Sequence, residues 1–189
     1  MRRRLAPDDR RAQLLAHGVA CFAEHGIARA TQAQVAQRAG VSVSAVYSYF
    51  RTRGDLVDAV LDAVAATIVA MVTEAIAAPG PPREVLTRLA ERTAAMAADE
   101  PDTVRVWLDW STGVRSDVWP QFLALQQQLH RLVESILAAG TGTVSPATRS
   151  AARLFVGGAH TLALMRFEHV GEDELGLFIA QMVGGVTAL

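Results

Sequence analysis

The sequence predicts an all-α fold, and three observations support this. Apolar residues make up 51% of the 189 positions and recur at helical spacing. Hydroxyl residues followed three positions later by Gln or Asp mark several helix starts, while Gly or Pro marks the ends. No segment shows the alternation that is typical of strands. Together these patterns divide the chain into about nine helices.

The first half of the chain supplies the clearest helix boundaries. Pro7 suits the first turn of the opening helix. Thr31-Gln-Ala-Gln34 is a capping box for a short helix that ends before Gly40, a residue suited to a left-handed turn. Ser42 caps a second short helix, and Thr52-Arg-Gly-Asp55 is another capping box that opens a long one.

The second half follows the clearest break in the chain, Pro79-Gly-Pro-Pro82. Its helices are separated by Pro101, Gly113, the stretch 140–146 and Gly171. The predicted helices span about 7–25, 32–39, 43–49, 54–78, 83–98, 101–114, 117–139, 146–169 and 172–187.

Charge is distributed unevenly along the chain. Up to Arg53, nine arginines face three acidic residues, whereas the remainder has nine arginines and sixteen acidic residues. A basic first quarter on an acidic body predicts that a polyanion binds at the N-terminal end. All the basic residues are arginine, a side chain that favours phosphate recognition.

Cysteine content and hydropathy indicate the compartment. Cys21 is the single cysteine, so an internal disulfide framework is excluded. No uncharged apolar run reaches the length that a membrane span needs, and no secretory signal pattern is present. We expect a soluble, cytoplasmic protein without a membrane partner.

The two short helices and the turn Ala39-Gly-Val-Ser42 predict a helix-turn-helix. Ser44, Ala45 and Ser48 are small, which would let the second helix approach the floor of the DNA major groove. Tyr49 and Arg53, at its far end, suit phosphate contacts, whereas Val46 and Phe50 suit the core and Tyr47 suits either role. An ordinary helical hairpin with a solvated face is the alternative.

Several segments resemble a known family. Between Gln13 and Leu61, "FAEHGIARAT", "VAQRAGVSVSAVYSYF" and "DLVDAVL" resemble the DNA-binding domain of the TetR family of transcriptional regulators. Downstream, "VWLDWSTGVRSDVWPQF" is similar to a segment of the LuxR/HapR/SmcR group of that family, which are quorum-sensing master regulators. That group usually has Gln in place of Gly40 and Asn in place of Ser48.

The resemblance implies a DNA-binding domain at 1–54 and a ligand-binding and dimerisation domain at 55–189. It also places an arginine arm before the first helix, where Arg2 and Arg4 match residues that enter the minor groove; a solvated tail is the alternative. Double-stranded DNA with a near-palindromic operator is the expected partner. The predicted DNA contacts are Arg2, Arg4, Thr31, Ser42, Ser44, Ala45, Tyr47, Ser48, Tyr49 and Arg53.

A pocket for a small apolar ligand is implied in the C-terminal domain. Trp107 matches a pocket tryptophan of the group, and Gln126 and His130 match two polar positions with different residue types. Gln126 and His130 could equally lie at a water boundary, and Trp107 could be plain core. The predicted lining is Ile68, Met71, Leu89, Trp107, Gln126, His130, Val133, Val156 and Ala159.

The resemblance further implies a homodimer that forms through the last two helices, as a two-fold axis requires a self-complementary patch. The alternative is that these helices only cover the core of one chain. The predicted interface is Gly157, Gly158, Leu162, Met165, Leu175, Phe178, Ile179 and Met182.

Enzymatic function is not expected. No His pair has the spacing of a helical zinc site, and no nucleophile, base and orienting group occur together, so we predict no metal and no cofactor. Two regulatory roles stay open: a quorum-sensing-type master regulator, or a local repressor that a drug or metabolite releases.

Overall fold

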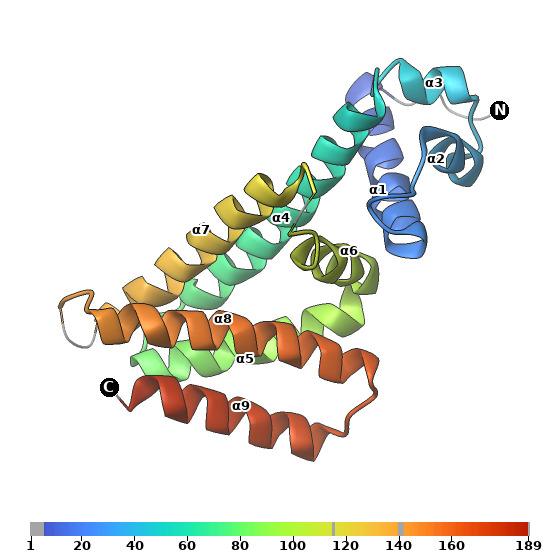
Figure 1. Ribbon diagram of the computed structural model, residues 1–189. Helices are drawn as coiled ribbons and strands as arrows, with labels where there is room; N and C mark the ends of the chain where they lie inside the picture. Colours follow the sequence, from blue (N-terminus) through green and yellow to red (C-terminus); the bar gives the residue numbers. More distant parts are fainter. Residues whose placement is uncertain (1–5, 115, 140–141, 189) are drawn as a thin grey trace. The chain divides into compact units, whose positions relative to one another are not determined.

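The computed structural model describes residues 6–114, 116–139 and 142–188, and all regular secondary structure in these ranges is helical (Figure 1). The all-α prediction is therefore confirmed. The helices are α1 (Pro7–His25), α2 (Gln32–Ala39), α3 (Val43–Tyr47), α4 (Arg53–Ala77), α5 (Pro82–Asp99), α6 (Pro101–Ser111), α7 (Trp119–Ala138), α8 (Pro146–Phe167) and α9 (Glu172–Thr187).

The chain divides into two compact units. Unit 1 contains the residues up to Thr67 together with Asp102–Thr112, and unit 2 contains Ile68–Pro101 and the residues from Gly113 onward. The compact units divide after Thr67, inside α4, and the predicted domain boundary near residue 54 stays a prediction. Unit 1 extends into α4 because that helix packs against α1: a Cβ on Gly18 would lie 3.0 Å from Cγ2 of Val60.

Unit 1 is built from α1, α2, α3, the first part of α4, and α6. Helix α2 contacts both α1 and α3, and the three helices enclose a small apolar core. Its side chains are at most 1% exposed: Leu14, Phe22, Val35, Val46, Phe50 and Leu56. This core fixes the orientation of α3 and leaves its opposite face to solvent.

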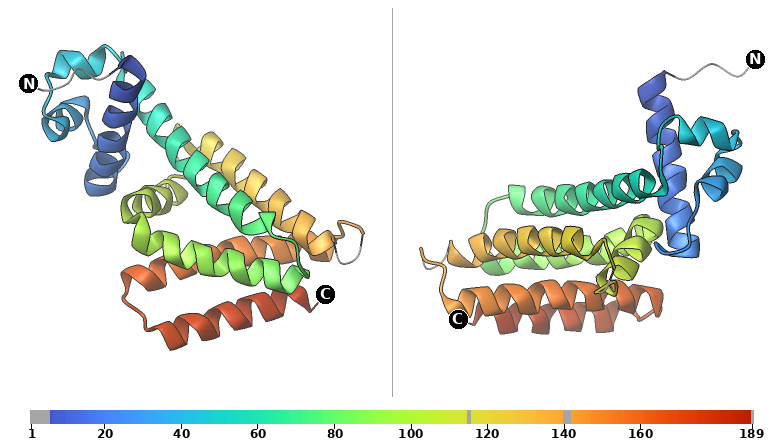
Figure 2. Two further views of the ribbon diagram at one scale, coloured as in Figure 1. Left: turned by 180° about the vertical axis from the view of Figure 1, so that it is seen from behind. Right: turned by 45° about the horizontal axis from the view of Figure 1, so that its top comes forward.

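Unit 2 is built from the last part of α4 and from α5, α7, α8 and α9. Helix α8 contacts α5, α7 and α9, so it has neighbours on several sides. Figure 1 and both views of Figure 2 show α8 and α9 side by side as an antiparallel hairpin. The most deeply buried side chains of this unit include Leu86, Phe155, Leu162 and Leu175.

Three predicted helices end two or three residues earlier than expected, among them α8, which ends at Phe167 instead of residue 169. Helix α3 ends at Tyr47 instead of about residue 49, and α6 ends at Ser111 instead of residue 114. In both cases the last turn tightens: Tyr49 N donates to Val46 O at 3.0 Å, and Thr112 N donates to Asp109 O at 3.2 Å. Such i to i−3 bonds close a helix with 3₁₀ geometry.

Helix α4 is long and apolar enough, by composition alone, to cross a membrane. Leu56, Val60, Val64 and Ile68 follow one face of the helix and are at most 3% exposed. Across its most apolar 18-residue window, 39% is buried inside the protein. One face of α4 therefore packs as core, as in an amphipathic helix.

Candidate DNA-binding site

The turn between α2 and α3 has the geometry that the sequence predicts. Thr31 N donates to Gln34 Oε1 at 2.8 Å and Gln34 N donates to Thr31 Oγ1 at 3.3 Å, which completes the capping box. Gly40 adopts φ 64° and ψ 38°. A Cβ at Gly40 would meet no atom within 4 Å, so glycine is needed there for its left-handed backbone rather than for space.

Helix α3 is anchored by its cap and by two buried side chains. Ser42 Oγ accepts a hydrogen bond from Ala45 N at 3.2 Å, as predicted for an N-cap. Val46 and Phe50 are 0% and 1% exposed and point into unit 1, also as predicted. The helix is therefore held by one face, which is the arrangement that a groove-binding helix requires.

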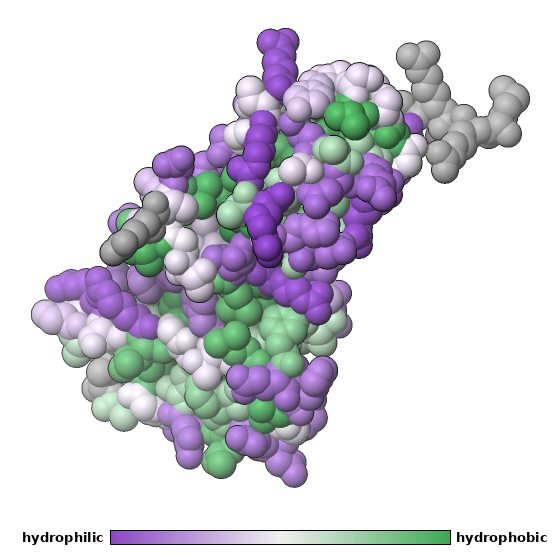
Figure 3. All heavy atoms as spheres, turned by 45° about the vertical axis from the view of Figure 1, so that its right-hand side comes forward, coloured by the Kyte–Doolittle hydropathy of each residue, from purple (hydrophilic) through white to green (hydrophobic). Residues whose placement is uncertain are grey.

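The opposite face of α3 is open to solvent. Ser44, Tyr47 and Ser48 are exposed and Ala45 is half-buried, so the predicted reading residues are accessible. Val43 is 42% exposed on the same helix and was not among the predicted contacts. Figure 3 shows how hydrophobic groups interrupt a mainly hydrophilic surface on the face that it draws.

A buried glutamine, which the sequence analysis missed, ties α2 to the end of the motif. Gln32 is 5% exposed, and its Nε2 donates to Phe50 O and to Thr52 O, the second at 3.3 Å. The amide thereby holds the backbone between α3 and α4. Gln32 directly follows the Thr31 cap and is polar, so the spacing of apolar residues along α2 does not mark it as buried.

Arg53 has a structural role that the sequence did not predict. Its Nε donates to Ala30 O at 3.1 Å and its Nη2 donates to Ile27 O, so the guanidinium holds the loop between α1 and α2. Tyr49 is half-buried beside this region of α3. The phosphate contacts of Arg53 and Tyr49 stay predictions.

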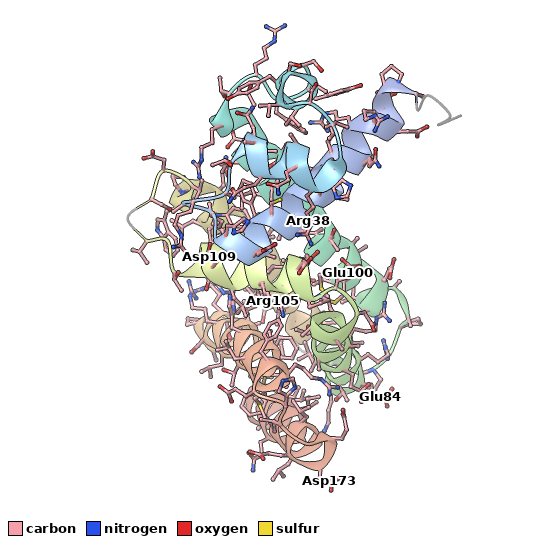
Figure 4. The ribbon with its side chains drawn as sticks, turned by 90° about the vertical axis from the view of Figure 1, so that its right-hand side faces the viewer. Arg38, Glu84, Glu100, Arg105, Asp109 and Asp173 are labelled. Atoms are coloured by element: carbon pink, nitrogen blue, oxygen red, sulfur yellow. The ribbon has the colours of Figure 1, made fainter. Side chains whose placement is uncertain are left out.

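The same loop is held from a second element of unit 1. Asp109, on α6, accepts a hydrogen bond from Ile27 N through Oδ2 at 2.8 Å, and Figure 4 shows the carboxylate beside the end of α1. Gly26, the residue before Ile27, has φ 81°, a conformation that favours glycine.

The other basic residues of unit 1 have varied surroundings. Cζ of Arg11 lies 5.4 Å from the centre of the Phe50 ring, a distance suited to a cation–π contact. Arg38 pairs with Glu24 at 2.9 Å on the surface. Arg2 and Arg4, the predicted minor-groove arm, lie outside the described residues.

The predicted ligand pocket draws on residues of both units. Trp107, which is 4% exposed, belongs to unit 1. The other eight belong to unit 2: Ile68, Leu89, Val133 and Val156 are buried, whereas Met71, Gln126, His130 and Ala159 are half-buried. Their assembly into one pocket stays a prediction.

His130 is the ionisable group among these pocket residues. Burial lowers the pKa of its imidazole, and the positive charge of Arg153 lowers it further, while Glu134 partly opposes both. The neutral imidazole is therefore favoured. Together with the half-buried Gln126 amide one turn earlier, it offers a hydrogen-bond donor and an acceptor beside the buried Val133.

A separate groove lies between α5 and α9. Its volume is about 180 Å³, and it shares no residue with the predicted pocket. Arg83 and Glu91 contribute opposite charges from α5, and the small residues Gly176 and Ala180 line the groove on the α9 side. The groove is lined by Arg83, Thr87, Glu91, Gly176, Ile179, Ala180 and Val183.

Half of the predicted dimer contacts are buried inside the chain. Leu162 and Leu175 are 0% and 2% exposed, and Met165 and Ile179 are also buried, so these side chains are not accessible to a second copy. Phe178 is half-buried.

Gly158 also has a packing role inside the chain. A Cβ there would lie 2.1 Å from Sδ of Met182, so the glycine permits close packing of α8 against α9 within one chain. Its neighbour Gly157 is exposed, and a Cβ there would meet nothing within 4 Å.

Other residues form the solvent-facing side of this hairpin. Leu154 and Leu164 on α8 are 65% and 47% exposed, and Leu177 on α9 is 58% exposed. Gly157 lies between the two α8 leucines at helical spacing. The sequence analysis missed these leucines because α8 carries apolar residues on nearly every side.

Metal-binding side chains are not gathered anywhere in the part of the chain that the structure describes: no three of His, Cys, Asp or Glu lie close enough to hold an ion. Cys21 is buried, and this burial raises the pKa of its thiol. A thiol that stays protonated is a poor nucleophile and a poor metal ligand.

Comparison with known proteins agrees with this geometry. Residues 14–60 match the family model described as bacterial regulatory proteins of the tetR family. The HTH-type transcriptional regulator LuxR of Vibrio harveyi is 33% identical over 135 residues, which cover 71% of this chain and 66% of that protein. The match thus spans slightly less than two thirds of this relative.

Solved structures share the fold over nearly the whole chain. A TetR-like transcriptional regulator from a Rhodococcus species has a TM-score of 0.82 and 19% identity, covering 98% of this chain and 100% of that one. A TetR family regulator from Agrobacterium tumefaciens has a TM-score of 0.82 and 17% identity, covering 97% and 100%.

These relatives are transcriptional regulators, which confirms the prediction that the chain is not an enzyme. The matched segment contains the whole helix-turn-helix and the anchored α3 described above. The chain therefore belongs to the TetR family of bacterial transcriptional regulators.

Proposed function

We propose that the protein is a sequence-specific DNA-binding regulator whose helix α3 enters the major groove of its operator. The observation that carries this proposal is the one-sided burial of α3. Val46 and Phe50 hold the helix on the unit 1 core, while Ser44, Tyr47 and Ser48 face solvent. The uneven charge of the chain, with its basic first quarter, supports binding of a polyanion at this end.

The regulator acts, we propose, as a homodimer formed by α8 and α9. The exposed leucines Leu154, Leu164 and Leu177, with Gly157 among them, supply an apolar surface that a second copy would cover. Two-fold symmetry would set two α3 helices about one turn of DNA apart, which requires a near-palindromic operator.

Unit 2 is proposed to bind a small apolar ligand near Gln126 and His130. Its donor and acceptor groups would orient the ligand, while Val133, Val156 and Leu89 supply apolar contacts.

The likeness to LuxR of Vibrio harveyi favours a quorum-sensing-type master regulator. A local repressor that is released by a drug or metabolite is the second candidate, because the fold serves both roles.

Selection of DNA by the full-length chain tests the central proposal. A random duplex library is bound to the protein, and we expect enrichment of one motif with two related half-sites. Enrichment of no motif would contradict sequence-specific binding. Genome-wide binding then separates the two roles: many sites near unrelated genes indicate a master regulator, and one divergent promoter indicates a local repressor.

A further inference from the structure

The hydroxyl groups on the exposed face of α3 are engaged with their own helix. Ser48 Oγ donates to Ala45 O at 2.7 Å, and the Oγ atoms of Ser42 and Ser44 lie 3.0 Å apart. Ser42 Oγ also accepts from Ala45 N. The Ser48 proton is therefore used, and its oxygen presents lone pairs only. The Ser42–Ser44 contact uses one of its two hydroxyl protons, so the other proton and the Tyr47 hydroxyl are donors that remain for acceptors on base edges.

Apolar surface is more abundant there. Val43 is 42% exposed and Tyr47 is 47% exposed, and as residues i and i+4 they lie on one line of the helix. Val46, three residues after Val43, is 0% exposed and anchors the neighbouring side of the helix on the core. The two side chains thus form a partly exposed apolar strip between the buried side of α3 and the exposed serines.

We propose that Val43 recognises the 5-methyl group of thymine in the major groove, and that Tyr47 extends the same apolar contact. The thymine methyl is the apolar group that base pairs present in that groove. The inference rests on the proposed DNA-binding function and deepens it. It states that the positions of thymine methyl groups contribute to operator selection by α3.

Uracil substitution in the operator tests this proposal directly. Uracil has the hydrogen-bonding edge of thymine but lacks the 5-methyl group. Each thymine of the duplex selected by the full-length chain is replaced in turn, and binding is measured at fixed salt. At one or two positions per half-site we expect roughly fourfold weaker binding, the change that follows from losing about 0.8 kcal/mol for one buried methyl.

The variant Val43→Ala tests whether the Val43 side chain causes the weaker binding of the uracil duplexes. It should bind the thymine and uracil duplexes with equal affinity at those positions, and uracil effects elsewhere in the half-site should persist. Val43→Ile keeps a branched apolar side chain and should retain the sensitivity. Val144→Ala makes the same valine-to-alanine change at a residue that is 48% exposed in unit 2, and it should leave the uracil profile unchanged.

The outcomes separate this inference from the function on which it rests. If no duplex is enriched, the proposed function itself fails. If duplexes are enriched but every uracil is tolerated, or if Val43→Ala keeps the full uracil sensitivity, DNA binding stands and methyl recognition by Val43 is wrong.

Discussion

Gln32 shows how far the geometry of the helix-turn-helix depends on one side chain. Its amide reaches two carbonyl oxygens, those of Phe50 and Thr52, in the segment that links α3 to α4. Both bonds form away from bulk solvent, since Gln32 is 5% exposed. A buried carbonyl that loses its donor costs more than the bond contributed, because water does not replace it.

We therefore expect Gln32→Leu to lower the free energy of unfolding by about 1–3 kcal/mol, the cost of an unpaired buried polar group. Equilibrium urea unfolding of the full chain measures this change. The matched control is Gln37→Ala, at an exposed position of the same helix, which should alter stability by less than about 0.5 kcal/mol. Equal effects of the two changes would contradict the role given to Gln32.

At the scale of elements, adjacent glycines in α8 have opposite roles. Gly158 faces α9, where a Cβ would lie 2.1 Å from Sδ and 3.0 Å from Cγ of Met182. Gly157 faces solvent with no atom within 4 Å of such a Cβ. Glycine weakens a helix interior, so only Gly158 has a packing reason within one chain.

Alanine substitution should separate the two glycines. Gly157→Ala should raise the unfolding free energy by up to about 1 kcal/mol through helix propensity. Gly158→Ala should lower it, because the added methyl overpacks the α8–α9 contact. The double variant Gly158→Ala with Met182→Ala should recover part of that loss in thermal unfolding. If both single variants are stabilising, the close packing at Gly158 is not needed.

Local sequence patterns predicted the helices, but they did not predict which distant residues each helix contacts. The Thr31 box, the left-handed Gly40 and the Ser42 cap depend on residues three or four positions apart, so the sequence contains them. The bond from Ile27 to Asp109 joins residues 82 positions apart and leaves no local pattern. Helix α8 has neighbours on several sides, so its sequence likewise does not reveal which of its leucines stay exposed.

At the scale of the whole molecule, the proposed function depends on assembly of two copies. The proposed interface is apolar and exposed on α8 and α9, and it would set the spacing of the two α3 helices. Each interface residue occurs twice across a two-fold axis, so a single substitution acts twice.

Leu177→Glu should therefore weaken self-association by about 100-fold or more, because two carboxylates would enter an apolar contact. Sedimentation at several protein concentrations should show a monomer where the parent chain is a dimer. Leu123→Glu makes the same change at a leucine of α7 that is 41% exposed, and it should leave the dimer intact. A monomeric parent chain, or a dimer that survives Leu177→Glu, would refute this interface.

The hydrogen bond between Ile27 and Asp109 has a consequence for synthesis on the ribosome. Unit 1 is discontinuous in the chain, since α6 is made after the 34 residues from Ile68 to Pro101. At about 5–20 residues per second, these residues delay completion of the DNA-binding unit by roughly 2–7 s. During that interval the nascent unit 1 lacks Asp109, whose carboxylate holds the loop between α1 and α2, so it should reach full order only after much of the regulatory half has been translated.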